Sequence, residues 1–221
     1  MRCLLFNIIL LFSLSGFASF YDLEVRPVLN SGFDSAGVGI LASTIALVGT
    51  LKGTDSTHLK DIQSKVNLNS DWNDLGDFLG TGAAGMFAVG IQYWVHEDIS
   101  YSRNHLRTLI WTGASTVLLK GVLQRERPYG GEHSMPSGHT STIFATATSL
   151  TYSYGWKAAL IAYPLALLTA VQRIDENKHW PSDVIAGAAL GVFWGRAIHN
   201  SFSENYSFVF TPNEVLLTIY Y

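Results

Sequence analysis

The chain has 221 residues, of which 14% are charged and 48% are hydrophobic, and its net charge is −3. This length is sufficient for one domain with a sizeable core, and the small negative net charge gives no electrostatic basis for binding nucleic acid. The charged fraction is well below the usual value of about a quarter. Together with a mean hydropathy of +0.21, it places the composition at the border between soluble and membrane proteins.

The N-terminus carries the pattern of an export signal. Arg2 precedes an apolar run from residue 4 to residue 14, and small residues follow at Gly16 and Ala18. This pattern predicts a signal peptide over residues 1–18 that is cleaved near its end. The alternative is an uncleaved membrane helix, although the run is shorter than the roughly 20 residues that a span requires. Since the single cysteine lies at position 3, neither disulfides nor cysteine chemistry is expected in the mature chain.

The remaining chain, residues 19–221, is predicted to form a single all-α domain built as a bundle of about six helices. The apolar segments that predict these helices are 36–51, 78–95, 108–124, 141–154, 157–173 and 183–199. Pro128 cannot extend a helix and is expected to stop the third segment. The other segments are predicted to be an irregular lead-in over 19–33, a polar loop or short surface helix over 52–73, and a short extended end or hairpin over 206–221.

Two cations precede Pro128. Lys120 and Arg127 are seven residues apart, which on a helix is two turns, so both side chains are predicted to lie on one helix face. A phosphoryl group in transfer carries negative charge on its equatorial oxygens, which suits an ammonium and a forked guanidinium. Taken alone, two exposed basic residues on a solvated surface are the more ordinary interpretation. Arg125, between them, is interpreted as a surface charge.

The tetrapeptide Pro136-Ser137-Gly138-His139 immediately precedes the fourth predicted helix. Gly138 lets the backbone approach an anion closely, and the free N–H groups of the following helical turn point toward that anion. Ser137 adds a hydroxyl donor, and His139 is placed to give a proton to a leaving oxygen. By itself, the tetrapeptide would be interpreted as a simple helix N-cap followed by an incidental histidine, and only its combination with the other two segments favours phosphate binding.

A third group of residues, Arg173, His179 and Asp183, lies around the junction of the last two predicted helices. His179 and Asp183 are four residues apart, so their side chains can meet. A carboxylate that accepts a hydrogen bond from one ring nitrogen fixes the tautomer and leaves the other nitrogen free to attack. The alternatives are helix capping by Asp183 and a metal pair, but no further ligand stands at a suitable spacing, so no metal is expected.

These three segments, in this order and at these spacings, resemble the motifs of the type 2 phosphatidic acid phosphatase (PAP2) superfamily. The resemblance covers about residues 118–197 and departs at Gln172, where the family has a serine that we expect to be peripheral to the chemistry. It implies that His179 attacks phosphorus to form a phosphohistidine, that Asp183 orients it, and that His139 protonates the leaving alcohol and then activates water. It also implies that the phosphate oxygens are held, without metal or cofactor, by five residues: Lys120, Arg127, Ser137, Gly138 and Arg173.

The same resemblance implies a metal-independent phosphatase of the cell envelope. The expected substrates are lipid phosphates such as phosphatidate, lipid A or an isoprenyl phosphate. Three alternatives stay open: a soluble periplasmic acid phosphatase, a vanadium haloperoxidase in which His179 ligates vanadate, and a non-catalytic envelope protein. Because lipid phosphatases of the superfamily carry the site on the outer face of the membrane, the site is expected on the extracytoplasmic side. Predicted helices of only about 14 to 18 residues favour a periplasmic or peripheral protein, whereas the low charge content favours the membrane.

Overall fold

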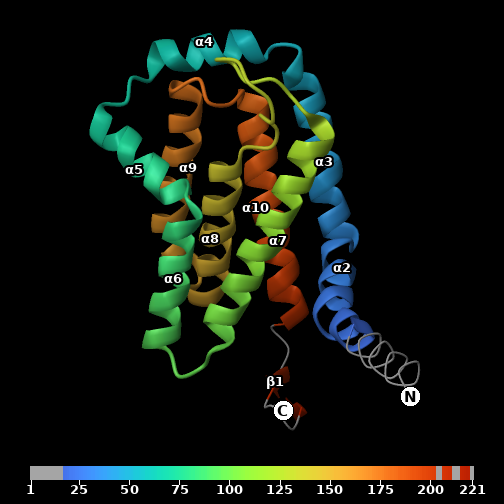
Figure 1. Ribbon diagram of the computed structural model, residues 1–221. Coiled ribbons are helices and arrows are strands. Elements are labelled where there is room, and N and C mark those ends of the chain that lie inside the picture. The colour runs from blue at the N-terminus through green and yellow to red at the C-terminus, as the bar shows by residue number, and fades with distance from the viewer. Residues whose placement is uncertain (1–16, 203–205, 211–214, 220–221) are drawn as a thin grey trace, which may run out of the picture.

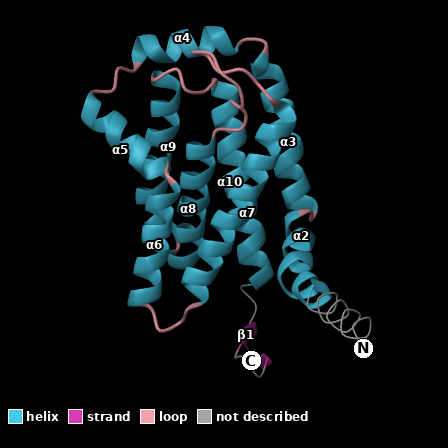
Figure 2. Cartoon of the chain, in the orientation of Figure 1, coloured by secondary structure: helices cyan, strands magenta, loops and turns pink. Residues whose placement is uncertain are grey.

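The computed structural model describes residues 17–202 and the strand segments 206–210 and 215–219. Apart from one strand pair it is helical, as Figures 1 and 2 show. The helices are η1 (Tyr21–Val25), α2 (Arg26–Gly32), α3 (Ser35–Lys52), α4 (Asp55–Lys65), α5 (Ser70–Gly80), α6 (Gly82–Val95), α7 (Ser100–Leu123), α8 (Gly138–Tyr154), α9 (Trp156–Asp175) and α10 (Pro181–Phe202). The strands β1 (Tyr206–Phe210) and β2 (Val215–Ile219) pair antiparallel.

The all-α prediction is confirmed, with more helices in the described residues than the six expected. The predicted segment 78–95 is divided between α5 and α6, which meet at a 64° bend. The prediction of an irregular lead-in over 19–33 is wrong, because residues 21–32 are helical and Pro27 stands in the first turn of α2, where proline is tolerated. Nearly all of the predicted signal peptide lies outside the described residues.

One end of the bundle gathers the loops that matter for the site. In Figure 1, α4 lies across the end where α7 and α9 finish and where α8 and α10 begin. The α7–α8 and α9–α10 loops, which carry the sequence motifs, therefore meet beneath α4. The helices η1 and α2 and the strand pair lie toward the opposite end, and α3 runs from there to α4 (Figure 1).

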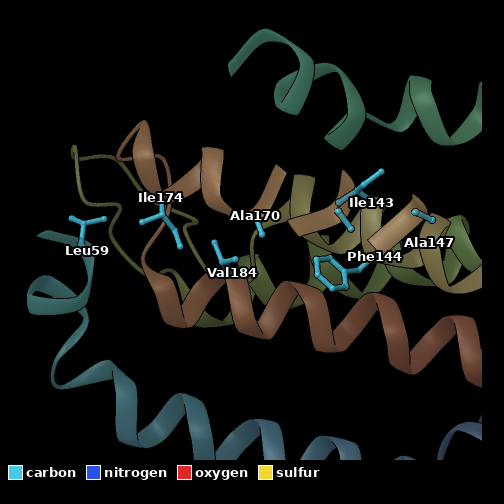
Figure 3. Packing of buried hydrophobic residues seen from close by; sticks show 9 residues of the cluster. Leu59, Ile143, Phe144, Ala147, Ala170, Ile174 and Val184 are labelled. Carbon is cyan, nitrogen blue, oxygen red and sulfur yellow. The ribbon is translucent and has the colours of Figure 1, made fainter. Parts of the chain in front are cut away.

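Two hydrophobic clusters hold the helices together. The first lies between α8, α9 and α10, with Leu59 of α4 at its edge (Figure 3). The second packs Val28 of α2 against Phe193 and Ile198 of α10. Burying one such large aliphatic or aromatic side chain stabilises the fold by about 1.5–3 kcal/mol. Since α10 contributes to both clusters, its first turn, which carries Asp183, is fixed relative to the rest of the molecule.

Glycine brings α10 unusually close to α8. Three glycines spaced four residues apart line the face of α10 that packs against α8: Gly187, Gly191 and Gly195. A Cβ atom on Gly187 would lie 2.6 Å from the carbonyl oxygen of Ser137, so no larger residue fits at this approach. The close contact allows the N–H of Ser137 to donate a 3.0 Å hydrogen bond to the carbonyl oxygen of Asp183. Helix packing thus joins the second sequence motif to the third.

Several helices present apolar surfaces outward. α3 and α9 are each long and apolar enough to cross a membrane. The bent α5–α6 pair also meets these criteria if the two helices are taken together as one span. Only 6% of the apolar window of α3 is buried, and large apolar side chains such as Trp94 on α6 and Val117 on α7 are 89% and 71% exposed. These surfaces indicate that the protein is associated with a membrane, which favours the membrane over the purely periplasmic alternative.

Candidate active site

The structure brings the predicted site residues together at the end of the bundle that α4 crosses. They are Lys120 in the last turn of α7, Arg127 in the α7–α8 loop, Ser137, Gly138 and His139 at the start of α8, Arg173 in the last turn of α9, His179 in the α9–α10 loop and Asp183 in the first turn of α10. Hydrogen bonds connect all three motifs, because Asp183 of the third motif contacts both Arg125 of the first and Ser137 of the second. The segments therefore form one site.

His179 and Asp183 are linked through the hydroxyl group of Ser134. Nδ1 of His179 lies 3.9 Å from Oδ2 of Asp183, which is longer than a direct hydrogen bond. The hydroxyl oxygen of Ser134 lies 3.3 Å from that Nδ1 and donates a 2.5 Å hydrogen bond to Oδ2 of Asp183. Because His179 precedes α10, the predicted helical spacing of the pair is wrong, although the two side chains still face each other. With Nδ1 anchored on this side, Nε2 is the ring nitrogen left to react.

Burial sets the protonation state of His179. The side chain is 4% exposed, and desolvation lowers the pKa of its imidazole below the ordinary value, as do the charges of Lys120 and Arg127. The carboxylate of Asp183 acts in the opposite direction and raises the pKa of His179, but the net shift is downward. The imidazole is therefore neutral near pH 7, with a lone pair available on its free nitrogen.

Asp183 remains ionised although it is fully buried. Burial acts to raise the pKa of this carboxyl group, but the nearby His179 imidazole, the hydrogen bond from Ser134 and the charge of Arg125 outweigh it, so the pKa lies below the ordinary value. Oδ2 also accepts a 3.0 Å hydrogen bond from the N–H of Trp180, which is the reach of a capping-box residue back to the helix start. Asp183 thus caps the start of α10 and, through the Ser134 hydroxyl, is also connected to the His179 ring.

Arg125 is not a surface charge, contrary to the sequence prediction. Its side chain is 13% exposed and lies between two buried carboxylates. Nη1 donates 2.6 Å hydrogen bonds to Oδ1 of Asp183 and to the hydroxyl of Ser182, and Nη2 donates one of 2.6 Å to Oδ2 of Asp55. Asp55 in turn accepts from the N–H of Ser182 at 2.9 Å. The first turn of α4 is therefore tied to the first turn of α10.

Lys120 and Arg127 reach the site by a different route from the one predicted. α7 ends at Leu123 and Gln124 adopts a left-handed conformation, so Arg127 lies in the loop and the two cations do not share a helix face. Nζ of Lys120 donates to the carbonyl oxygens of His133 (2.5 Å) and Ser134 (3.3 Å). Desolvation, and then the charge of Arg127, lower the pKa of Lys120 to about 8. The loop thus still gathers both cations beside His179.

Ser137 acts as the N-cap of α8. Its hydroxyl oxygen accepts a 3.4 Å hydrogen bond from the N–H of Thr140 and a 2.9 Å hydrogen bond from the hydroxyl of the same residue. A Cβ atom on Gly138 would lie 3.9 Å from Cε of Lys120, which places the first residue of α8 beside that cation. The N-cap interpretation is therefore correct, and the first turn of α8, with its free N–H groups, lies beside Lys120.

His139 and Arg173 share a carboxylate from α5. Nε2 of His139 lies 3.3 Å from Oδ1 of Asp77, and Nη2 of Arg173 donates to that same oxygen. Arg173 also contacts Glu176 at 3.2 Å, and its Nε donates a 2.6 Å hydrogen bond to Oε1 of Gln172. Gln172, which was expected to be peripheral, therefore orients a site arginine.

The environment of His139 makes its imidazole less basic than that of an ordinary histidine. Desolvation and then the charge of Arg173 lower the pKa of His139 to about 4, while the carboxylate of Asp77 acts to raise it. The charge of Arg127 contributes a smaller reduction. His139 and Arg173 thus lie in one cluster around Asp77.

Four contributing residues were not identified from the sequence: Asp55, Asp77, Arg125 and Ser134. Asp55 has the pattern of an ordinary acidic residue at a helix start, and nothing in the sequence separates Asp77 from the other aspartates of α5. Arg125 was visible in the sequence because it lies between the two predicted phosphate-binding cations, but it was interpreted as a surface charge. Among the described residues, no group of three or more histidine, cysteine, aspartate or glutamate side chains has a geometry that could hold a metal ion.

Comparison with known proteins gives the following similarities. Residues 101–207 match the family model described as the PAP2 superfamily. Over 75 residues the chain is 44% identical to a protein of Porphyromonas gingivalis named lipid A 1-phosphatase, and this match covers 32% of the chain and 17% of that protein. The matched region thus spans less than a fifth of the curated relative.

Two solved structures resemble this one. The crystal structure of Aquifex aeolicus LpxE has a TM-score of 0.57 at 22% identity, and covers 63% of this chain and 90% of that one. A transmembrane PAP2-type phosphatidylglycerolphosphate phosphatase from Bacillus subtilis has a TM-score of 0.55 at 16% identity, and covers 73% of this chain and 92% of that one. At these identities the similarity shows a shared fold.

Proposed function

We propose, from the premise that this chain belongs to the PAP2 superfamily, that it is a membrane-associated phosphatase which removes phosphate from lipid phosphomonoesters through a phosphohistidine intermediate. The first candidate substrate is lipid A carrying a 1-phosphate, because a relative named lipid A 1-phosphatase is 44% identical to this chain over 75 residues. The observation that carries the proposal is the neutral, buried His179 held on its Nδ1 side by Ser134 and Asp183.

In the first step, Nε2 of His179 attacks phosphorus. The N–P bond forms while the bond between phosphorus and the ester oxygen breaks, and the leaving oxygen takes a proton from His139 to depart as an alcohol. The proton on Nδ1 of His179 stays directed at the Ser134 hydroxyl, and the ionised Asp183 stabilises the positive charge that the ring acquires. The product of this step is a phosphorylated His179 and a neutral His139.

In the second step, water hydrolyses the phosphohistidine. His139 takes a proton from the water as its oxygen attacks phosphorus, and the N–P bond breaks to return neutral His179. His139 then carries the proton that the next cycle requires. Inorganic phosphate is the second product.

The phosphate oxygens require a cluster of positive charge and N–H donors. We assign this role to the side chains of Lys120, Arg127 and Arg173, together with the hydroxyl of Ser137 and the N–H of Gly138. Charge-assisted hydrogen bonds of this kind are about twice as strong as neutral ones, and the start of α8 adds the favourable end of a helix dipole. None of these roles needs a metal ion.

The preference for a lipid rests on the surface around the site. The helices of the bundle carry exposed apolar side chains, and the site lies at the end of the bundle that α4 crosses (Figure 1). An acyl chain can therefore remain in the membrane while its phosphate reaches the cations. We further propose that this end faces the extracytoplasmic side, as the superfamily resemblance implies.

A phosphate-release screen tests this function. The purified full chain is assayed in detergent with EDTA against lipid A, phosphatidate and an isoprenyl phosphate, with p-nitrophenyl phosphate as the soluble comparison. We expect turnover of lipid phosphates and none for a His179→Gln variant that remains folded. Turnover of the soluble ester alone would favour a soluble-substrate phosphatase, and activity that His179→Gln retains would refute the mechanism.

A further inference from the structure

The α5 helix contributes a carboxylate to the site from a region without any motif. Two glycines let α5 approach: a Cβ atom on Gly76 would lie 3.0 Å from the Gln172 side chain, and one on Gly80 would lie 2.5 Å from Cβ of His139. The hydroxyl of Thr169 on α9 also donates a 3.1 Å hydrogen bond to the carbonyl oxygen of Gly76. Asp77, which lies between these glycines, is therefore held in register with the catalytic machinery.

Asp77 contacts both His139 and Arg173, and the positive charge of Arg173 disfavours protonation of His139. One oxygen atom, Oδ1, lies 3.3 Å from Nε2 of His139 and accepts a hydrogen bond from Nη2 of Arg173. The Asp77 side chain is 54% exposed, whereas those of His139 and Arg173 are 32% and 6% exposed. Asp77 is thus the solvent-facing member of this group of three.

We propose that Asp77 is the positioning residue that keeps His139 protonated for its acid role, so that the site contains a second histidine–carboxylate pair. This inference rests on the proposed phosphatase function. Nε2 of His139 directs its proton toward Asp77, and Nδ1 is the nitrogen that exchanges a proton with the leaving oxygen. Asp77 thereby does for His139 what Asp183 does for His179.

The need for such a partner follows from the charges around His139. The ring faces Asp77 of α5, Arg173 of α9, His179 of the α9–α10 loop and Arg127 of the α7–α8 loop, and Asp77 is the one of these that raises its pKa. Without substrate, desolvation and Arg173 dominate and hold the pKa at about 4. A histidine in that state has no proton to give near pH 7.

Substrate binding changes this balance. A bound phosphate dianion brings negative charge to Arg173, which offsets the main positive neighbour of His139, and it adds a further negative charge beside the ring. Arg173 remains held by Gln172 and Glu176, so the Asp77 carboxylate, which already contacts Nε2 of His139, interacts with that ring more strongly once the phosphate neutralises Arg173. The pKa of His139 then rises when the phosphate that needs the proton is in place.

The test compares leaving groups. In Asp77→Asn, release of the alcohol from an alkyl phosphate such as monododecyl phosphate is expected to fall about 10²-fold in a single turnover, the low end of a general-acid contribution. Release of p-nitrophenolate, which leaves without a proton, should change far less, and KM should stay similar. Equal losses for both esters, or no loss for either, would overturn the assignment.

The matched control is Glu176→Gln, which alters a contact of Arg173 but none of His139. It should not change the ratio of the two rates, and the same leaving-group dependence in this variant would contradict the proposal. An NMR titration of the His139 imidazole supplies a readout independent of turnover. The Asp77→Asn substitution should move that titration to lower pH, and an unmoved titration would overturn the inference. Failure of the wild-type chain to hydrolyse any ester would instead count against the proposed function.

Discussion

Nη1 of Arg125 donates a 2.6 Å hydrogen bond to Oδ1 of Asp183, and this contact joins the first sequence motif to the third. The opposite side of the same guanidinium group binds Asp55 at the start of α4. The carboxylate that faces His179 is therefore itself fixed by a charge from the α7–α8 loop. α4, which carries no motif, becomes a support for the site.

The first prediction concerns this buried network. Arg125→Ala should lower the free energy of unfolding by about 3–5 kcal/mol, because it leaves two buried carboxylates without their cation. Thermal or denaturant unfolding in detergent would measure the loss. Arg26→Ala is the control, since Arg26 and Asp22 form a pair whose side chains are 64% and 59% exposed, and such pairs contribute about 0–1 kcal/mol. Similar losses in both variants would contradict a buried network.

The second prediction concerns the hydroxyl that links His179 to Asp183. Ser134→Ala should reduce kcat by roughly 10- to 100-fold, the size seen when a partner that orients a reactive imidazole is removed. KM should remain nearly constant, because Ser134 contacts the nucleophile through its side chain and Lys120 through its backbone carbonyl. Steady-state kinetics on the substrate found in the screen measures both constants. A rise in KM with kcat unchanged would place Ser134 in phosphate binding instead.

The third prediction is a pH dependence. The pKa of Lys120 is lowered to about 8, so its charge is present below that pH and is lost as the pH rises through it. Since a neutral amine holds a phosphate oxygen less well, kcat/KM should fall above about pH 8, and this quantity reports the free enzyme. In Lys120→Arg the guanidinium stays charged, so this decline should disappear even if the overall activity is lower. A decline that persists unchanged in the arginine variant would assign it to another group.

The fourth prediction concerns the contact between α5 and His139. In Gly80→Ala the new methyl group would lie 2.5 Å from Cβ of His139, and relieving such overpacking costs about 1–3 kcal/mol. A displacement of the histidine by about 1 Å is enough to reduce the rate by about 10²-fold. Gly82→Ala, two residues further on, is the control, because nothing lies within 4 Å of its Cβ position. Turnover and melting temperature of both variants would be compared, and equal activities would mean that His139 tolerates the shift.

The helices and the three motifs could be predicted because both are local patterns. The apolar segments are long and sit between polar or proline-containing breaks, so their helical state follows from the sequence. Two predictions were wrong because of a single residue. Arg127 was expected on the α7 helix, but Gln124 adopts a left-handed conformation and ends that helix first. Gln172 was expected to be peripheral, but its side chain accepts a hydrogen bond from Arg173. The division between α5 and α6 was not visible, because the apolar pattern continues through the bend.

The sequence by itself determined which chemical groups this protein can bring to a phosphate: two histidines, a carboxylate and three cations at fixed spacings. Only the tertiary structure decided which further carboxylates support these groups. Asp55 is 127 residues from Ser182, and Asp77 is 62 residues from His139. Each of these pairs is in contact, and no local pattern encodes contacts at such separations. They meet because glycines and two hydrophobic clusters bring α4, α5, α8 and α10 to one end of the bundle, where burial makes each charged contact strong.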